Sequence, residues 1–148
     1  MNVTLTLNGE RQTVAVGAEE MLLAVLRRLG MRSVRETCGI GVCGSCTVLV
    51  DGRAVSGCLL LAPLADGCTV VTAEGLADDR VAAAVADAHA YQCGWCTPGF
   101  VVALRGLLDE NPEPTENDAK DALAGNLCRC GSYLKVLDAV RAVSTVNP

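Results

Sequence analysis

Eight of the nine cysteines in this 148-residue chain fall into two groups of four. The first group is Cys38, Cys43, Cys46 and Cys58, and the second group is Cys93, Cys96, Cys128 and Cys130. Thiolate sulfur is the usual ligand of iron–sulfur clusters, and four cysteines hold one cluster. We therefore predict that each group holds one iron–sulfur cluster.

The first group has the spacing Cys-x4-Cys-x2-Cys with a distant fourth cysteine, which is the spacing of plant-type [2Fe–2S] ferredoxins. Gly39, Gly41 and Gly44 lie between its cysteines. Glycine adopts positive φ without strain, so backbone N–H groups can approach negatively charged sulfur closely. The loop is therefore able to wrap a [2Fe–2S] cluster.

The same glycines also read Gly-x-Gly-x-x-Gly, the pattern of a dinucleotide-binding loop. That site needs a preceding strand, a following helix and an acidic residue farther along the chain. Here the glycines alternate with cysteines, and the residues that follow, 47–50, are β-branched or aliphatic and favour a strand. We therefore reject the nucleotide interpretation.

The second group is less specific, because Cys93-x2-Cys96 alone fits a zinc site, a redox dithiol or part of an iron–sulfur site. Cys128 and Cys130 are close for independent side chains, and this spacing suits two ligands on one iron. The residues favour an iron–sulfur site, while structural zinc and a redox dithiol stay open as alternatives.

Two predicted helix ends lie beside the second group. Thr97, with Pro98 at the first helical position, is expected to cap one helix, and Ser132 is expected to cap another. The N-terminus of a helix carries a partial positive charge. Two such ends suit an anionic cluster better than a neutral dithiol.

The first half of the chain predicts an α+β unit. Its expected elements are strands at 2–8 and 11–16 around Asn8-Gly9, a helix at 19–29 followed by Gly30, strands at 47–50 and 53–55 around Asp51-Gly52, and a strand at 69–72. Asn-Gly and Asp-Gly between β-prone runs are strong hairpin signals. We therefore predict a β-grasp, plant-type ferredoxin-like domain over residues 1–75.

The second half predicts an all-α domain of four helices over residues 76–148, after a linker near 73–79. The expected helices run from an Asp78-Asp79 cap to about Ala90, from Thr97 to Asn111-Pro112, from Thr115 toward Leu123, and from Ser132 onward. Capping residues begin these segments, and apolar residues recur within them at three- and four-residue spacing. The fold class is therefore α+β, with a ferredoxin-like domain before a helical one.

Composition excludes several classes of protein. A hydrophobic content of 51% argues against disorder, and a formal charge of −5 argues against a nucleic-acid partner. No stretch is long and apolar enough to cross a membrane, and the first residues resemble no export signal, so we expect a reduced, cytoplasmic setting. A mean hydropathy of +0.35 favours a chain partly covered by another subunit.

Three stretches together carry a family resemblance. Residues 36–52 (ETCGIGVCGSCTVLVDG), 92–99 (QCGWCTPG) and 125–133 (GNLCRCGSY) are similar to the small iron–sulfur subunits of the xanthine oxidase family of molybdenum hydroxylases. The resemblance implies a first cluster far from molybdenum and a second cluster near it. Electrons would pass from a molybdopterin in a large partner subunit through both clusters to a flavin on a medium FAD-binding subunit, or to a cytochrome.

The resemblance also implies roles for single residues. Gln92 matches the position whose amide hydrogen-bonds the pterin, and Cys130 matches the ligand that lies against it. A primary amide has both a donor and an acceptor for the mixed edge of a pterin. The end of the last motif, Cys130-Gly131-Ser132-Tyr133, is most similar to the isoquinoline, nicotinate and aldehyde oxidoreductase branches, some of which reduce a cytochrome.

The predicted function is electron transfer within an oxidoreductase complex that oxidises a heteroaromatic, purine-like, aldehyde or related small substrate. We expect no catalytic residue in this chain. The alternatives are a free-standing two-cluster ferredoxin, which would have no use for Gln92, and a zinc-binding structural module.

Three further residues are expected to have structural roles. Cys68 is expected to be an inert, at least partly buried thiol, His89 to end a helix, and Trp95 to shield a cluster.

Overall fold

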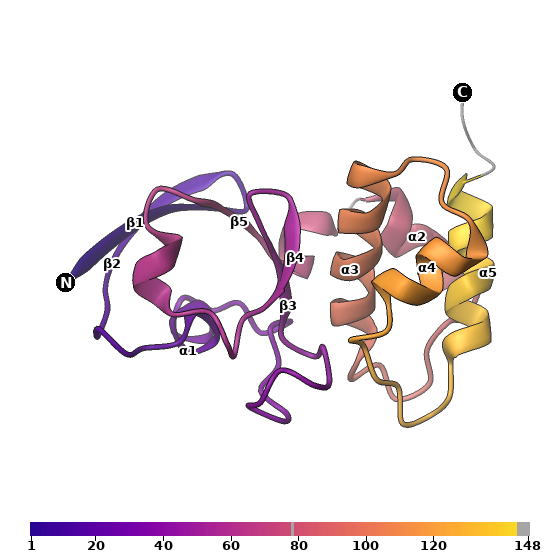
Figure 1. Ribbon diagram of the computed structural model, residues 1–148, viewed down its shortest axis with the longest axis horizontal. Coiled ribbons are helices and arrows are strands. Elements are labelled where there is room, and N and C mark those ends of the chain that lie inside the picture. The colour runs from indigo at the N-terminus through magenta and orange to yellow at the C-terminus, as the bar shows by residue number, and fades with distance from the viewer. Residues whose placement is uncertain (78, 145–148) are drawn as a thin grey trace.

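The computed structural model describes residues 1–77 and 79–144, which form a sheet-containing lobe and a helical lobe (Figure 1). The elements in chain order are β1 (Asn2–Leu7), β2 (Glu10–Ala15), α1 (Leu22–Arg28), β3 (Thr47–Val50), β4 (Arg53–Ser56), the 3-10 helix η1 (Ala62–Ala65), β5 (Thr69–Val71), the 3-10 helix η2 (Ala73–Leu76), α2 (Arg80–Asp87), α3 (Thr97–Glu110), α4 (Glu116–Ala122) and α5 (Tyr133–Ser144). This is the α+β architecture that the sequence predicts.

The five strands form one mixed sheet in the order β2-β1-β5-β3-β4. β1 and β5 are parallel, and the other neighbouring strands are antiparallel. Both hairpins turn where the sequence predicts: Asn8 and Gly9 have φ of 50° and 88°, and Asp51 and Gly52 have φ of 48° and 81°. Positive φ at both central residues gives a turn whose twist matches that of the strands.

The core of the sheet lobe lies between the sheet and α1. Its fully buried side chains include Leu22, Val25 and Leu26 of α1 and Val3, Leu5, Val48 and Val70 of the strands. Each such side chain contributes about 1.5–3 kcal/mol by leaving water. The helix begins at Leu22, later than expected, because Glu20 is held in a turn in which its carboxylate accepts the Gly17 N–H at 3.0 Å.

The helical lobe contains the four predicted helices, and two of its predicted caps are confirmed. The Asp79 carboxylate accepts the Val81 N–H at 2.7 Å at the start of α2, while Asp78 lies outside the described residues. Thr115 and Asp118 form a reciprocal capping box at the start of α4. These local contacts satisfy backbone donors that a helix leaves unpaired at its N-terminus.

Two helix boundaries differ from the prediction. α3 is preceded by Cys96 as its N-cap, because the Cys96 carbonyl accepts the first helical bond from the Phe100 N–H at 3.2 Å. Thr97 is therefore the first helical residue rather than the cap. α2 ends at Asp87 rather than near Ala90, and His89 then adopts φ of 50°, so its predicted helix-end role is confirmed.

The lobes are joined by packing as well as by the chain. Leu49 of β3 is buried in the hydrophobic core of the helical lobe, and a Cβ on Gly106 of α3 would lie 3.0 Å from its Cδ2 atom. Asn8 holds the connecting segment, because its side chain accepts the Thr72 N–H at 2.9 Å and donates to the Thr72 hydroxyl at 3.0 Å. The boundary at residues 75 and 76 stays a prediction.

None of the helices within residues 1–77 and 79–144 is both long enough and apolar enough to span a membrane.

Candidate metal centres

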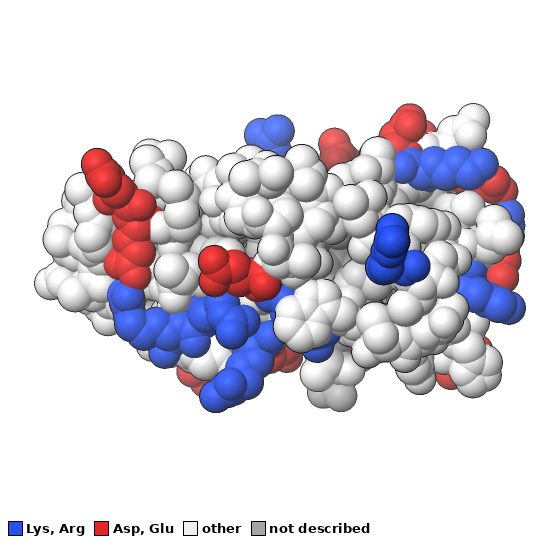
Figure 2. All heavy atoms as spheres, turned by 90° about the horizontal axis from the view of Figure 1, so that it is seen from below, with Lys and Arg blue, Asp and Glu red and all other residues white. Residues whose placement is uncertain are grey.

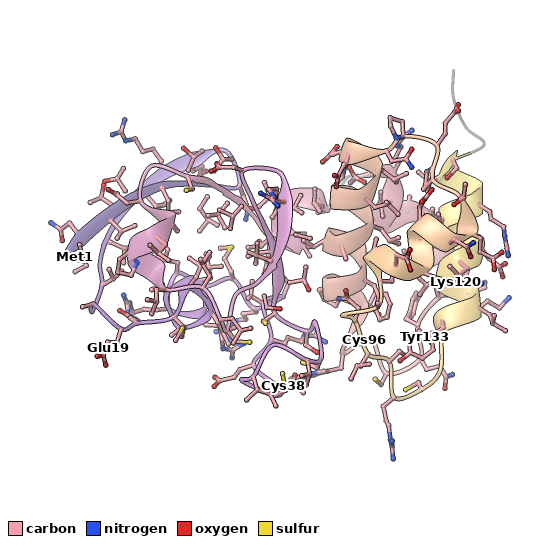
Figure 3. All side chains as sticks on the ribbon, in the orientation of Figure 1. Met1, Glu19, Cys38, Cys96, Lys120 and Tyr133 are labelled. Carbon is pink, nitrogen blue, oxygen red and sulfur yellow. The ribbon has the colours of Figure 1, made fainter. Side chains whose placement is uncertain are left out.

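Both cysteine groups lie along one edge of the molecule, near the junction of the two lobes. Figure 3 shows Cys38 on the long loop of the sheet lobe and Cys96 near the end of α3, both at the lower edge of the view. The first three cysteines of the first group lie in the loop between α1 and β3, and the fourth follows β4. The second group lies in the loops that precede α3 and α5.

The first group forms two thiol pairs. Cys38 interacts with the Cys43 side chain, and Cys46 interacts with the Cys58 side chain. Hydrogen bonds from the Ile40 N–H and then from the Cys43 thiol lower the pKa of Cys38 to about 6. Burial raises the pKa of Cys46 to about 11. Cys38 is therefore close to backbone N–H donors, whereas Cys46 lies in an apolar environment.

Two glycines are required by this loop. Gly41 and Gly44 have φ of 76° and 69°, and both lie against neighbouring atoms. A Cβ on Gly41 would lie 2.2 Å from the Leu59 Cδ1 atom, and a Cβ on Gly44 would lie 2.5 Å from the Gly125 carbonyl oxygen. Position 44 therefore favours glycine for two reasons: its φ is positive, and a loop of the helical lobe lies too close for a side chain.

The second group brings cysteines of two loops together. Cys93 interacts with the Cys130 side chain, and Cys96 interacts with the Cys128 side chain. That Cys128 and Cys130 share one iron stays a prediction.

The surroundings of these thiols differ in the same way as in the first group. The Trp95 N–H and then Cys130 lower the pKa of Cys93, whereas burial and then Cys128 raise the pKa of Cys96 to about 12. Burial would also raise the pKa of Cys128, but hydrogen bonds, including one from the Ser132 N–H at 3.4 Å, outweigh it and lower that pKa. Backbone N–H groups thus point at sulfur in both groups.

The arrangement fits two-iron clusters. Over the described residues, no three cysteine, histidine or acidic side chains converge as ligands for a single ion. Each iron of a [2Fe–2S] cluster takes two cysteine thiolates, so two thiol pairs per group match one cluster. A cavity of about 420 Å³ lies between the groups, bordered by Cys43, Cys93, Cys96 and Cys128 among others. The chain therefore has both ligands and space for such a group.

Three contacts that the sequence analysis missed hold the two groups together. The Leu127 N–H donates to the Cys43 carbonyl at 2.9 Å, and the Asn126 amide donates to the Gly44 carbonyl at 3.1 Å. A Cβ on Gly99 would lie 2.2 Å from that same carbonyl oxygen. Asn126 is 5% exposed, and a buried amide requires such partners. The indication available in the sequence was that Asn126 stands two residues before Cys128.

Trp95 and Arg35 form a second bridge. The Trp95 indole N–H donates to the Thr37 hydroxyl at 2.9 Å, and the Arg35 guanidinium lies 4.6 Å from the centre of the indole ring. Trp95 remains 51% exposed. It therefore faces solvent on one side, and its predicted shielding of a cluster stays a prediction.

Gln92 and Cys130 are brought together, although 38 positions separate them in the chain. The exposed Gln92 side chain donates from Nε2 to the Cys130 carbonyl at 3.0 Å. Nearby, the Cys128 N–H donates to the Tyr133 hydroxyl at 2.8 Å, and Tyr133 packs edge-to-face against Phe100. The loop before α5 is therefore fixed against both α3 and the segment that contains Gln92.

Cys68 is partly buried, as predicted. Its sulfur lies 3.7 Å from the Leu64 carbonyl oxygen and 3.9 Å from the Asp66 carbonyl oxygen. Burial and then a hydrogen bond to Asp51 raise the pKa of its thiol, and its inert role stays a prediction.

Comparison with known proteins agrees with this geometry in both lobes. Residues 5–67 match the family described as 2Fe-2S iron-sulfur cluster binding domain, and residues 72–141 match the family described as [2Fe-2S] binding domain. The chain is 42% identical over 146 residues to the nicotinate dehydrogenase small FeS subunit of Eubacterium barkeri, covering 95% of this chain and 93% of that protein. It is also 42% identical over 144 residues to the nicotine 6-hydroxylase small subunit of Paenarthrobacter nicotinovorans, covering 95% and 87%.

Solved structures support the same assignment. Quinoline 2-oxidoreductase from Pseudomonas putida 86 superposes with a TM-score of 0.91 at 37% identity, covering 97% of this chain and 93% of that chain. The aldehyde oxidoreductase of Desulfovibrio desulfuricans superposes with a TM-score of 0.93 at 37% identity, although this chain covers only 17% of it. These relatives are subunits or parts of oxidoreductases. The chain therefore belongs to the small iron–sulfur subunits of the xanthine oxidase family, the electron-transfer subunits of molybdenum hydroxylases.

Proposed function

We propose that this chain carries electrons from a molybdopterin centre in a large partner subunit to an outer acceptor through two [2Fe–2S] clusters. The observation that carries the proposal is that eight cysteines lie in two sets of four, on loops that contact each other at Gly44, Gly99 and Asn126. In this proposal Cys38, Cys43, Cys46 and Cys58 hold the first cluster, and Cys93, Cys96, Cys128 and Cys130 hold the second. The bound molybdopterin would supply the two-electron oxidation of the substrate.

The second cluster is proposed to lie nearer molybdenum. Gln92 supports this direction, because its exposed amide uses one N–H on the Cys130 carbonyl and still has a second N–H and a carbonyl oxygen. Those two groups match a pterin edge, which offers both donors and acceptors. Cys130 would then lie against the pterin, and the first cluster would face the outer acceptor.

The surface around the two groups supports partner subunits. Figure 2 shows that the middle of this face is largely uncharged, with arginine and lysine side chains gathered mainly toward the sheet lobe. In the ligand loops, the exposed apolar side chains include Ile40, Val42 and Leu127, which are 68%, 53% and 51% exposed, and Leu134 at the start of α5 is 76% exposed. Apolar surface of this kind is typical of interfaces. We propose a large molybdopterin-binding subunit on the second group and a medium FAD-binding subunit, or a cytochrome, on the first.

The substrate class and the setting are part of the same proposal. The relatives are named for nicotinate, nicotine, quinoline and aldehyde, which supports a heteroaromatic or aldehyde substrate for the complex. A reduced, cytoplasmic setting is supported by nine cysteines that form no disulfide.

Anaerobic reconstitution of the full chain tests the two-cluster claim. We expect about four iron and four acid-labile sulfide per chain, as two all-cysteine [2Fe–2S] clusters require. Bound zinc, or only half of that iron, would contradict the assignment. Native mass measurement after co-expression with neighbouring reading frames then separates a stable heteromeric complex from a free-standing ferredoxin.

A further inference from the structure

Arg35 is bonded to both cysteine loops. Its backbone N–H donates to the Ser45 carbonyl at 3.0 Å, inside the loop of the first group. Its side-chain Nη1 donates to the Gly94 carbonyl at 2.8 Å and to the Trp95 carbonyl at 2.7 Å. Gly94 and Trp95 are the two residues between the first two cysteines of the second group. One residue thus joins the ligand loops of both groups.

The guanidinium of Arg35 is held firmly in this place. Two carbonyl oxygens accept from it, and the Trp95 ring lies beneath it at 4.6 Å. The ring is itself anchored to the sheet lobe through Thr37. An arginine side chain stays positively charged at every working pH, so a fixed positive charge lies between the two groups.

One peptide connects Arg35 to a sulfur of the second group. The Gly94 carbonyl and the Trp95 N–H belong to the same peptide unit. Arg35 donates to the carbonyl end of this peptide at 2.8 Å, and the N–H end acts on the Cys93 sulfur. A charged donor on the carbonyl polarises the peptide, which strengthens the hydrogen bond that its N–H makes.

Hydrogen bonds to sulfur and nearby positive charge both favour the reduced state of an iron–sulfur cluster, because reduction adds one negative charge. We propose that Arg35 is a positioning residue that raises the reduction potential of the second cluster through the Gly94–Trp95 peptide. The inference rests on the proposed function, since it requires a cluster bound at Cys93. Its role would be to favour electron entry at the second cluster.

The test is a redox titration of the reconstituted full chain, monitored by the electron paramagnetic resonance of each cluster. In Arg35→Gln we expect the ratio of reduced to oxidised second cluster, at a fixed potential, to fall about tenfold, which is about 59 mV for one electron. The first cluster should shift less. Arg35→Lys keeps the charge but loses the planar fork, so its shift should lie between those of Arg35→Gln and wild type.

Arg32→Gln is the matched control, because Arg32 is exposed and lies three positions earlier in the chain. Equal shifts in Arg32→Gln and Arg35→Gln would overturn the proposal, since they would reflect net charge alone. If the Arg35→Gln protein does not bind the second cluster, the titration is made on Arg35→Lys instead. An unchanged reduction potential of the second cluster in Arg35→Lys would overturn the proposal that Arg35 acts through the Gly94–Trp95 peptide. A wild-type chain without two [2Fe–2S] signals would instead contradict the proposed function.

Discussion

At the scale of single residues, cysteines of identical chemistry differ because of what surrounds them. Cys38 and Cys93 receive backbone N–H groups, which lower their pKa, whereas burial raises the pKa of Cys46 and Cys96. In each group, therefore, a thiol that ionises easily accompanies one that resists ionisation without metal. Metal binding removes this difference, because a coordinating thiol is deprotonated.

Replacing one ligand in each group should damage the clusters selectively. Cys43→Ser is expected to remove the first cluster signal and Cys96→Ser the second, with iron content falling from about four to about two per chain. Electron paramagnetic resonance of the dithionite-reduced protein, together with iron analysis, measures both effects. Cys68→Ser is the matched control and should retain both signals. Loss of a cluster in that control would show that the thiols are grouped wrongly.

Gln92 allows a prediction about the direction of electron flow. In the assembled complex, Gln92→Ala should weaken retention of the molybdenum cofactor, or slow reduction of the clusters by substrate, by roughly five- to hundredfold. The reason is that losing a partner of a buried polar edge costs about 1–3 kcal/mol. Molybdenum content and stopped-flow reduction measure these effects. A change confined to transfer toward the outer acceptor would reverse the proposed order of clusters.

At the scale of elements, the contact between the two ligand loops is the feature that aligns the candidate sites. α3 reaches the first loop at Gly99, and the loop before α5 reaches it through Asn126 and Leu127. The distance between the clusters therefore depends on buried backbone contacts rather than on the connecting segment alone.

Asn126→Ala should destabilise this junction. The substitution removes two buried hydrogen bonds of the amide, to the Gly44 carbonyl and to the Thr47 hydroxyl, while the Gly44 carbonyl still accepts from the Thr47 hydroxyl at 2.7 Å. One such bond contributes about 0.5–1.5 kcal/mol, so the free energy of unfolding should fall by about 1–3 kcal/mol. Chemical denaturation measures it, and the exposed Asn2→Ala serves as the control. An unchanged stability would mean that the junction contributes nothing to the fold.

Glu74, in the segment between the lobes, makes a pH-dependent contribution to the stability of the folded state. Partial burial acts to raise the pKa of Glu74, but hydrogen bonds from Ser33 and Thr72 outweigh it and lower the pKa. The ionised carboxylate therefore favours the folded state. Its contribution is complete above the unfolded value near 4.5 and is lost as pH falls through the lower folded value.

The stability difference between wild type and Glu74→Gln tests this assignment. We expect a constant advantage for wild type from pH 7 down to about pH 5, and a shrinking advantage below the ordinary glutamate value near 4.5. Denaturation curves at each pH measure the difference, and Glu19→Gln controls for the loss of one negative charge. If the stability advantage of wild type instead grew as the pH fell, folding would raise the pKa of Glu74 rather than lower it.

At the scale of the whole molecule, both candidate sites lie along one edge, near the junction of the two lobes, as the positions of Cys38 and Cys96 show (Figure 3). This geometry leads to a spectroscopic prediction for the assembled enzyme. Magnetic coupling between Mo(V) and a reduced cluster should be strongest for the second cluster, since Gln92 and Cys130 lie on its side. Electron paramagnetic resonance of the partly reduced complex measures the splitting. Stronger coupling to the first cluster would contradict the proposed arrangement.

The sequence by itself determined the features that depend on neighbouring residues. Asn8-Gly9 and Asp51-Gly52 specify their hairpins because only a few residues tolerate positive φ at both turn positions. Thr115 with Asp118 specifies a helix start because the capping contacts span three residues. The grouping of the cysteines belongs here as well, since it rests on spacing and on a resemblance along the chain.

Only the tertiary structure decided which distant residues meet. It brought the Gln92 amide to the Cys130 carbonyl across 38 positions, and it brought Arg35 to the Gly94 carbonyl across 59 positions. It also placed the cap of α3 at Cys96, one residue before the threonine that capping preference indicates. Such contacts leave no local pattern, because they arise when two lobes bury a shared surface and each buried polar group takes the partner that packing leaves within reach.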